Sequence, residues 1–153
     1  MRVIVQVVKR SSVEILEKNI KNEINNGLNV LVGFTEGDTK EIVEALAKKI
    51  VNLRIFMDEN DKMNLSVIDT KGDILSISQF TLYGDVKKGN RPGFSNAMHP
   101  DEATKLYDYF NDCLKSHGVD VKVGEFGADM IVEIINVGPT TIILDSDEIV
   151  KKK

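Results

Sequence analysis

Four consecutive residues after an apolar run, Ser78-Gln79-Phe80-Thr81, carry the polar groups best suited to chemistry in this chain. The run before them, Ile74 to Ile77, is typical of a buried strand. The hydroxyls of Ser78 and Thr81 and the backbone amides of Phe80 and Thr81 could converge on a polar ligand and stabilise negative charge. The alternative is a strand end whose hydroxyls bond only to the local backbone.

A cluster of cations follows in the segment Lys87-Lys88-Gly89-Asn90-Arg91. Such a run is ordinarily a solvated turn. Beside a polar site, however, Lys87, Lys88 and Arg91 could hold a phosphate or two.

A third segment, Asn136 to Thr141, contains Gly138-Pro139 between two apolar runs. Because glycine and proline interrupt regular structure, the pattern predicts a hairpin or turn. Alternatively, the carbonyls of a stiff Gly-Pro pair could be aimed at a ligand. The sequence pattern does not decide whether the peptide bond before Pro139 is cis.

Common catalytic motifs are absent from the sequence. There is no G-x-S-x-G elbow, HExxH motif, paired cysteine or phosphate-binding glycine loop, which argues against triad hydrolases, zinc enzymes and P-loop enzymes. His99 precedes Pro100 at a predicted helix start and His117 falls in a last helical turn, so both are expected to be structural or exposed. We expect no metal and no cofactor.

The elements that must position these segments predict an α+β fold. One helix is predicted to begin at Asp38, with Glu41 completing a capping signature, and to bury a face ending at Val51. A second is predicted from Pro100 to His117-Gly118, with Cys113 as a small core residue. The predicted strands are Val3–Val8, Ser12–Leu16, Leu28–Phe34, Arg54–Met57, Ile74–Phe80, Asp120–Val123, Met130–Ile135 and Thr140–Leu144.

Length and charge limit the possible functions. A chain of 153 residues is expected to form one domain, and its net charge of −4 argues against a broad basic surface that follows a nucleic acid backbone. No secretory signal and no apolar run of about eighteen residues is present, so a cytoplasmic protein is expected. Lys151-Lys152-Lys153 are expected to be a solvated tail.

Together, the motifs resemble those of the D-aminoacyl-tRNA deacylase family. The resemblance runs from Met1 to about Asp145, which implies a single domain over residues 1–145 and a charged tail over residues 146–153. The fold it implies is a layered β-β-α sandwich with two main helices, assembled as a homodimer. It rests on Arg54-Ile55-Phe56, Lys62-Met63-Asn64-Leu65, Ser78-Gln79-Phe80-Thr81-Leu82, Arg91-Pro92, Phe94-Ser95, Asn136, Gly138-Pro139 and Thr141.

The resemblance implies hydrolysis of the ester that joins a D-amino acid to the terminal adenosine of tRNA, and of glycine mischarged on tRNA(Ala). This would be a chirality proofreading step in translation. The substrate's 2′-hydroxyl would help activate water, so the chemistry would be RNA-assisted. By this resemblance, Ser78, Gln79, Phe80 and Thr81 would surround the ester. Gly138-Pro139, in cis form and from the partner subunit, would be the filter against L-amino acids. Phe126 and Met130 would lie around the adenine, with Lys87, Lys88 and Arg91 beside that site.

One position departs from the family. Where the family commonly has Arg after the first-strand Gln, this chain has Val7 after Gln6. In the family that Arg is associated with orienting the Gly-Pro carbonyls, so Val7 leaves the anchoring of Gly138-Pro139 open, and Lys9 or Arg10 could take over that role. A related animal type also lacks the Arg but has prolines at the segment matching Ser78–Thr81, so the intact Ser-Gln-Phe-Thr favours the D-specific type.

Two alternatives stay open. The chain could be a catalytically impaired, dimeric protein that binds tRNA ends. It could also be a hydrolase with Ser78 as nucleophile, although no histidine lies in a recognisable partner motif.

Overall fold

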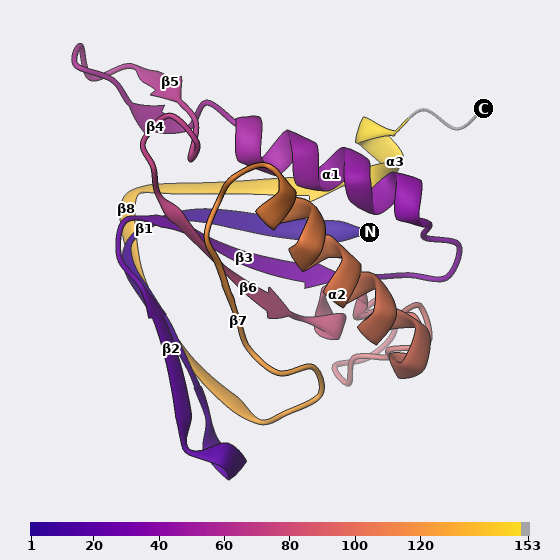
Figure 1. Cartoon of the computed structure of the whole chain (residues 1–153). Helices are drawn as coiled ribbons and strands as arrows, with labels where there is room; N and C mark the ends of the chain where they lie inside the picture. Colours follow the sequence, from indigo (N-terminus) through magenta and orange to yellow (C-terminus); the bar gives the residue numbers. More distant parts are fainter. Residues whose placement is uncertain (151–153) are drawn as a thin grey trace.

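The computed structural model describes residues 1–150, and a 14-residue first strand organises its main sheet. This strand, β1 (Arg2–Ile15), pairs through its first half with β3 (Gly27–Gly33) and through its second half with β2 (Ile20–Ile24). Along its other edge it pairs over nearly its whole length with β8 (Met130–Asp145), as Figure 1 shows. The sequence predicts two strands here. That prediction is wrong because Lys9 and Arg10 stay within β1, where Arg10 pairs with Ile135 of β8.

The rest of the sheet extends from β3. The strand β6 (Asp73–Ser78) pairs parallel to β3, and β7 (Val121–Val123) pairs parallel to β6. A separate hairpin contains β4 (Phe56–Met57) and β5 (Met63–Leu65). Strands β2 and β5 escape the sequence prediction because they are short and only Ile24 among their residues is buried, so neither has a buried apolar pattern.

Two helices cover one face of the sheet, α1 (Lys40–Asn52) and α2 (Pro100–Ser116) (Figure 1). Both contribute to one hydrophobic core with Val3, Val5 and Val30 of the sheet. This arrangement confirms the predicted α+β class and the predicted faces of both helices. The division into β-β-α layers stays a prediction. The residues buried by α1 are Val43, Leu46, Ala47, Ile50 and Val51, and those buried by α2 are Ala103, Tyr107, Phe110, Asn111 and Leu114.

The cap of α1 differs from the prediction. Thr39 is the N-cap, and its hydroxyl accepts a hydrogen bond of 3.3 Å from the backbone amide of Ile42. Asp38 instead accepts from the Met1 ammonium at 2.8 Å and from the backbone amide of Thr35 at 2.8 Å. The buried ammonium engages the carboxylate that the pattern assigns to the helix, so the adjacent threonine takes the capping role.

The ends of α2 confirm the predicted start and stop residues of this helix. Pro100 is the first helical residue, exposed His99 is the N-cap, and His117 is the C-cap. Cys113 packs against the core from a half-buried position, as expected of a structural cysteine. Burial raises the pKa of its thiol, which disfavours the reactive thiolate at neutral pH.

The chain after β8 forms a short helix, α3 (Ser146–Ile149), within the segment predicted as a tail. The side chain of Ser146 is buried, and Ile149 packs against the core. The predicted lysine tail, Lys151-Lys152-Lys153, lies outside the described residues. None of the helices in residues 1–150 is long and apolar enough to cross a membrane.

Phe110 gives a direct test of the core. Its side chain is fully buried in α2, so Phe110→Ala is expected to lower the free energy of unfolding by about 3–5 kcal/mol. Urea denaturation followed by circular dichroism measures the change. Asp112→Ala, at an exposed position of the same helix, is the matched control and should change stability by less than about 0.5 kcal/mol. A similar small loss for both variants would contradict this account of the core.

Candidate active site

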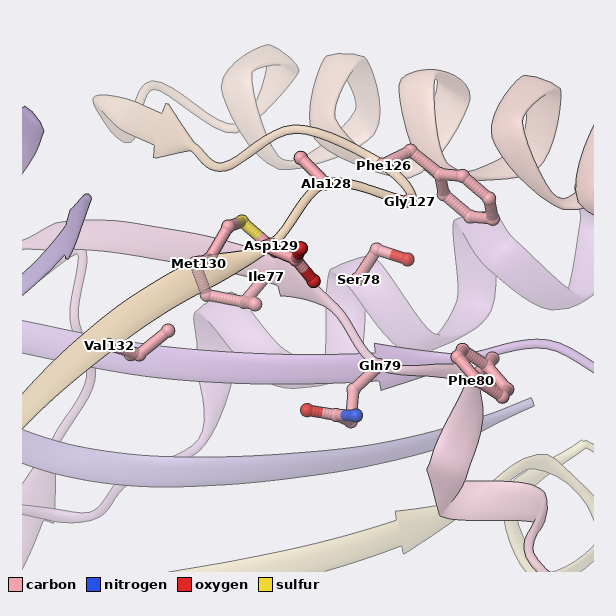
Figure 2. A pocket seen from close by; sticks show the side chains of 10 residues that line it. All are labelled: Ile77, Ser78, Gln79, Phe80, Phe126, Gly127, Ala128, Asp129, Met130 and Val132. Carbon is pink, nitrogen blue, oxygen red and sulfur yellow. The ribbon is translucent and has the colours of Figure 1, made fainter. Parts of the chain in front are cut away.

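A pocket of about 290 Å³ lies between the end of β6 and the segment that leads into β8. Figure 2 shows the side chains that surround it. It brings together segments about 50 positions apart in the sequence, because the end of β6 lies beside the loop before β8 and the first residues of β8. Its lining residues are Ile77, Ser78, Gln79, Phe80, Phe126, Gly127, Ala128, Asp129, Met130 and Val132.

The chain turns sharply at the end of β6. The predicted strand Ile74–Phe80 ends at Ser78, and Phe80–Tyr83 form the 3-10 helix η2. The Leu82 amide donates to the Gln79 carbonyl at 3.3 Å, which leaves the preceding amides of Phe80 and Thr81 without a partner inside the helix. Two adjacent backbone donors are therefore available beside the pocket.

The four residues of the predicted catalytic segment do not all line the pocket. Ser78, Gln79 and Phe80 line the pocket, with Ser78 half-buried and Phe80 52% exposed. Thr81 does not line it, but its hydroxyl accepts a hydrogen bond from the side-chain amide of Gln79. The structure thus brings three of the four into contact with the pocket and connects the fourth to Gln79.

Phe126 lines the same pocket from the loop before β8, and Met130 lines it from the first position of β8. The ring of Phe126 packs against Tyr107, with ring centroids 6.3 Å apart. Tyr107 donates a hydrogen bond of 2.7 Å to the Ser76 carbonyl, and burial raises the pKa of its hydroxyl, which keeps it a donor. Phe126 is therefore supported by a fixed neighbour.

Met130 is held by a close approach to Gly124. A Cβ atom added at Gly124 would lie 2.6 Å from the Met130 sulfur, so a side chain there would displace it. The same sulfur accepts a hydrogen bond of 3.4 Å from the backbone amide of Glu125. Glycine at position 124 thus leaves the space that the Met130 sulfur occupies.

Sequence reasoning missed several lining residues, of which Asp129 is the most chemically significant. No role is predicted from the sequence for Gly127-Ala128-Asp129, which lie between Phe126 and Met130. Gly127 has φ +76°, and the turn it forms exposes the Asp129 carboxylate at the pocket. A turn between two predicted ligand-binding residues is a signal that could have found it. Within residues 1–150, no three His, Cys, Asp or Glu side chains gather as a metal site.

Gly138-Pro139 lies inside the continuous strand β8, so the interpretation as a hairpin turn is wrong. Gln6 pairs with Thr141 and Val8 pairs with Asn136, so the four residues 137–140 stand opposite Val7 alone. The extra residues form a bulge, which lets the strand continue past the Gly-Pro pair.

The bulge is exposed, and its glycine has an unusual backbone. The Gly138-Pro139 peptide bond is cis, and Gly138 has φ +111°. Neither residue lines the pocket formed by Ser78 and Phe126 of the same chain. The structure of one chain therefore does not bring the predicted chirality filter to its own predicted catalytic segment.

Val7, the departure from the family pattern, faces the helices. Its side chain is 7% exposed and belongs to the main core, with Val5 and Leu28. Beside it, the Gln6 side-chain amide donates to the Thr141 hydroxyl at 3.4 Å, next to the bulge. Val7 thus packs in the core, and the side-chain hydrogen bond next to the bulge comes from Gln6.

The basic loop follows η2 and is closed by a bridge between Asp85 and Gly93, whose backbone groups exchange hydrogen bonds of 2.7 and 2.9 Å. Lys87, Lys88 and Arg91 are exposed on it and do not line the pocket. None of the three forms an ion pair with another residue in the part of the chain that the structure describes.

Comparisons with known proteins identify relatives over nearly the whole chain. The family model described as D-Tyr-tRNA(Tyr) deacylase matches residues 4–145. The D-aminoacyl-tRNA deacylases of Staphylococcus haemolyticus and Staphylococcus carnosus are 56% and 57% identical over 97% of each chain. The Staphylococcus aureus deacylase is 51% identical over the same share.

Solved structures agree on the fold. A structure described as the c-Myc DNA unwinding element binding protein has a TM-score of 0.87 and 40% identity over 95% of this chain and 98% of its own. A probable eukaryotic D-amino acid tRNA deacylase, at 20% identity, has a TM-score of 0.81 over 94% of this chain and 97% of its own. From its matched length and its identity to these relatives, the chain belongs to the D-Tyr-tRNA(Tyr) deacylase family.

Proposed function

We propose that this protein hydrolyses the ester bond between a D-amino acid, or glycine mischarged on tRNA(Ala), and the terminal adenosine of tRNA. It does so in the cytoplasm, as a homodimer. The observation that carries the proposal is the pocket where the end of β6 meets Phe126 and Met130. Membership of the deacylase family supports the same reaction.

The size and lining of the pocket suit one nucleoside. A volume of about 290 Å³ is at the lower end of the range for small-ligand sites, which matches an adenosine better than a longer RNA segment. Phe126 and Met130 offer an aromatic ring and a thioether for contact with adenine. The net charge of −4 fits this small footprint, because a terminal nucleoside needs few phosphate contacts.

The ester carbonyl binds at the turn after β6. In the tetrahedral intermediate of hydrolysis, negative charge develops on the carbonyl oxygen, and the amides of Phe80 and Thr81 are donors without partners inside η2. Ser78 and Gln79 fix the orientation of the ester beside them. The protein contributes position and hydrogen bonds, and the 2′-hydroxyl of the terminal ribose helps to activate water.

Selection against L-amino acids comes from Gly138-Pro139 of the partner subunit. Gly138 and Pro139 do not line the pocket of their own chain, so a second copy is needed to bring them to the ester. Main-chain atoms fill the space that an L side chain needs, whereas a D side chain or hydrogen points elsewhere. Exposed apolar residues of β8, with Val137 46% and Ile143 72% exposed, favour contact with a second subunit.

A substrate panel tests the proposal. The protein is incubated with D-Tyr-tRNA, L-Tyr-tRNA and Gly-tRNA(Ala), and the release of each amino acid is followed. We expect release from the D-Tyr and glycine esters, and at least about 100-fold slower release from L-Tyr-tRNA, because exclusion acts in the transition state. Sedimentation measures the mass, which should be that of two chains.

Each alternative has a distinct outcome in this panel. Tight binding of D-Tyr-tRNA without release of D-tyrosine would identify a binding protein that has lost turnover. Equal rates for D-Tyr-tRNA and L-Tyr-tRNA would contradict the chirality filter. Complete loss of hydrolysis in a folded Ser78→Ala variant would favour the serine nucleophile, whereas retained hydrolysis would exclude it.

A further inference from the structure

Two exposed aromatic rings meet at the mouth of the pocket. Phe80 is 52% exposed and Phe94 is 40% exposed, and their ring centroids lie 5.2 Å apart with the planes at 72°. Phe80 lines the pocket, whereas Phe94 lies outside it. The pair therefore extends an apolar surface from the nucleoside pocket outward.

Phe94 is fixed in place by its backbone neighbours. A Cβ atom added at Gly84 would lie 3.2 Å from Cε1 of Phe94, so the ring packs directly on the glycine that ends η2. The bridge between Asp85 and Gly93 comes immediately before Phe94 in the chain. The Phe94 carbonyl also accepts a hydrogen bond of 3.1 Å from the Ala97 amide. These contacts hold the Phe94 ring in position without a bound ligand.

The same bridge connects this aromatic surface to the cations. It closes the loop 86–92, which carries Lys87, Lys88 and Arg91, all exposed. Among the described residues these cations have no acidic partner, so they are available to an external anion. An exposed aromatic ring beside uncompensated cations is the combination that binds single-stranded nucleic acid.

We propose that Phe94 stacks on the base of the nucleotide that precedes the terminal adenosine, with the basic loop beside the connecting phosphates. The inference rests on the proposed function, because it places the terminal adenosine in the pocket next to Phe80. Every base has a face that can stack, so this contact selects a single-stranded end rather than a sequence. Phe94 is then a substrate-positioning residue.

The test is a double-mutant cycle on D-tyrosyl-RNA minihelices. One minihelix has the normal nucleotide before the terminal adenosine, and the other has an abasic nucleotide there with the phosphates unchanged. We expect base removal to raise the KM of the wild type about tenfold, and Phe94→Ala to raise the KM for the normal minihelix about equally. For Phe94→Ala, base removal should have no further effect.

Three further variants separate stacking from support of Phe80. Phe94→Leu keeps apolar bulk against Phe80 but has no ring, so it should behave like Phe94→Ala, whereas Phe94→Trp should restore the low KM. Val86→Ala, at an exposed apolar position of the same loop, should leave KM unchanged. Circular dichroism melting curves establish that each variant is folded.

Several outcomes would overturn the inference. The first is a wild-type KM that is the same for the normal and the abasic minihelix. The second is a KM for Phe94→Ala that base removal raises as much as it raises the wild-type KM. The third is a Phe94→Leu variant with the KM of the wild type. Each of them leaves D-Tyr-tRNA hydrolysis by the wild type intact. Failure of the proposed function would appear separately, as no release of D-tyrosine from full-length tRNA by the wild type.

Discussion

Replacing Gly138 with alanine is expected to lower kcat/KM for D-Tyr-tRNA by about 100-fold without unfolding the protein. Gly138 has φ +111°, a conformation that L side chains rarely adopt. An added Cβ would also lie 2.7 Å from the Thr140 hydroxyl and 3.0 Å from its backbone nitrogen. The bulge must rearrange, which moves the carbonyls that we propose meet the substrate in the partner's pocket.

Steady-state kinetics with D-Tyr-tRNA and L-Tyr-tRNA measure this effect. Gly37→Ala is the matched control, because Gly37 also has positive φ, of 94°, but an added Cβ there meets no atom within 4 Å and the residue lies outside the pocket. Both variants should stay folded, and Gly138→Ala alone should lose activity. Equal activity of the two would remove Gly138 from the mechanism.

The helices could be predicted from the sequence because their signals are local. Pro100 and the apolar spacing of α2 fix both its start and its buried face within one segment. The first cap could not be predicted, since the competitor for Asp38 is the ammonium of Met1, 37 positions away. A capping motif describes only its neighbours and contains no information on such a distant partner.

The ends of the strands could not be predicted for the same reason. Lys9-Arg10 and Gly138-Pro139 both look like interruptions, yet both lie within continuous strands. The β1 and β8 ladder explains why, because each long strand supplies the partner that keeps the other extended. Where a strand ends depends on its pairing with distant segments, and this pairing cannot be predicted from the sequence of one segment alone.

The candidate site could likewise be predicted only in part from local sequence. Local pattern indicated a polar turn at Ser78, but only the family resemblance joined it to Phe126 and Met130. The fold then brings in Asp129, which no motif marks. It also shows why Val7 fits here: the position faces the core, where an apolar side chain packs without the cost of burying a charge.

Removal of the 2′-hydroxyl from the terminal ribose is expected to lower the rate of catalysed hydrolysis by about 100-fold or more. The described residues that line the pocket include no histidine, and both His99 and His117 lie on α2 termini outside it. Apart from the Asp129 carboxylate, the pocket offers hydroxyl, amide and backbone groups, which orient an ester but do not remove a proton from water at neutral pH. A hydroxyl on the substrate, next to the ester, can take part in that transfer.

D-Tyrosyl minihelices ending in adenosine or 2′-deoxyadenosine test this directly, and each rate is divided by the spontaneous rate of the same ester. The Asp129 carboxylate is the competing base, so Asp129→Asn is the necessary companion variant. If the substrate hydroxyl acts, Asp129→Asn and Thr81→Ala should both retain turnover within about tenfold of the wild type, because neither removes the proton-transfer group. A deoxy ester hydrolysed as fast as the ribose ester would contradict RNA-assisted catalysis. So would a folded, tRNA-binding Thr81→Ala variant without turnover, since the reaction would then depend on a protein hydroxyl.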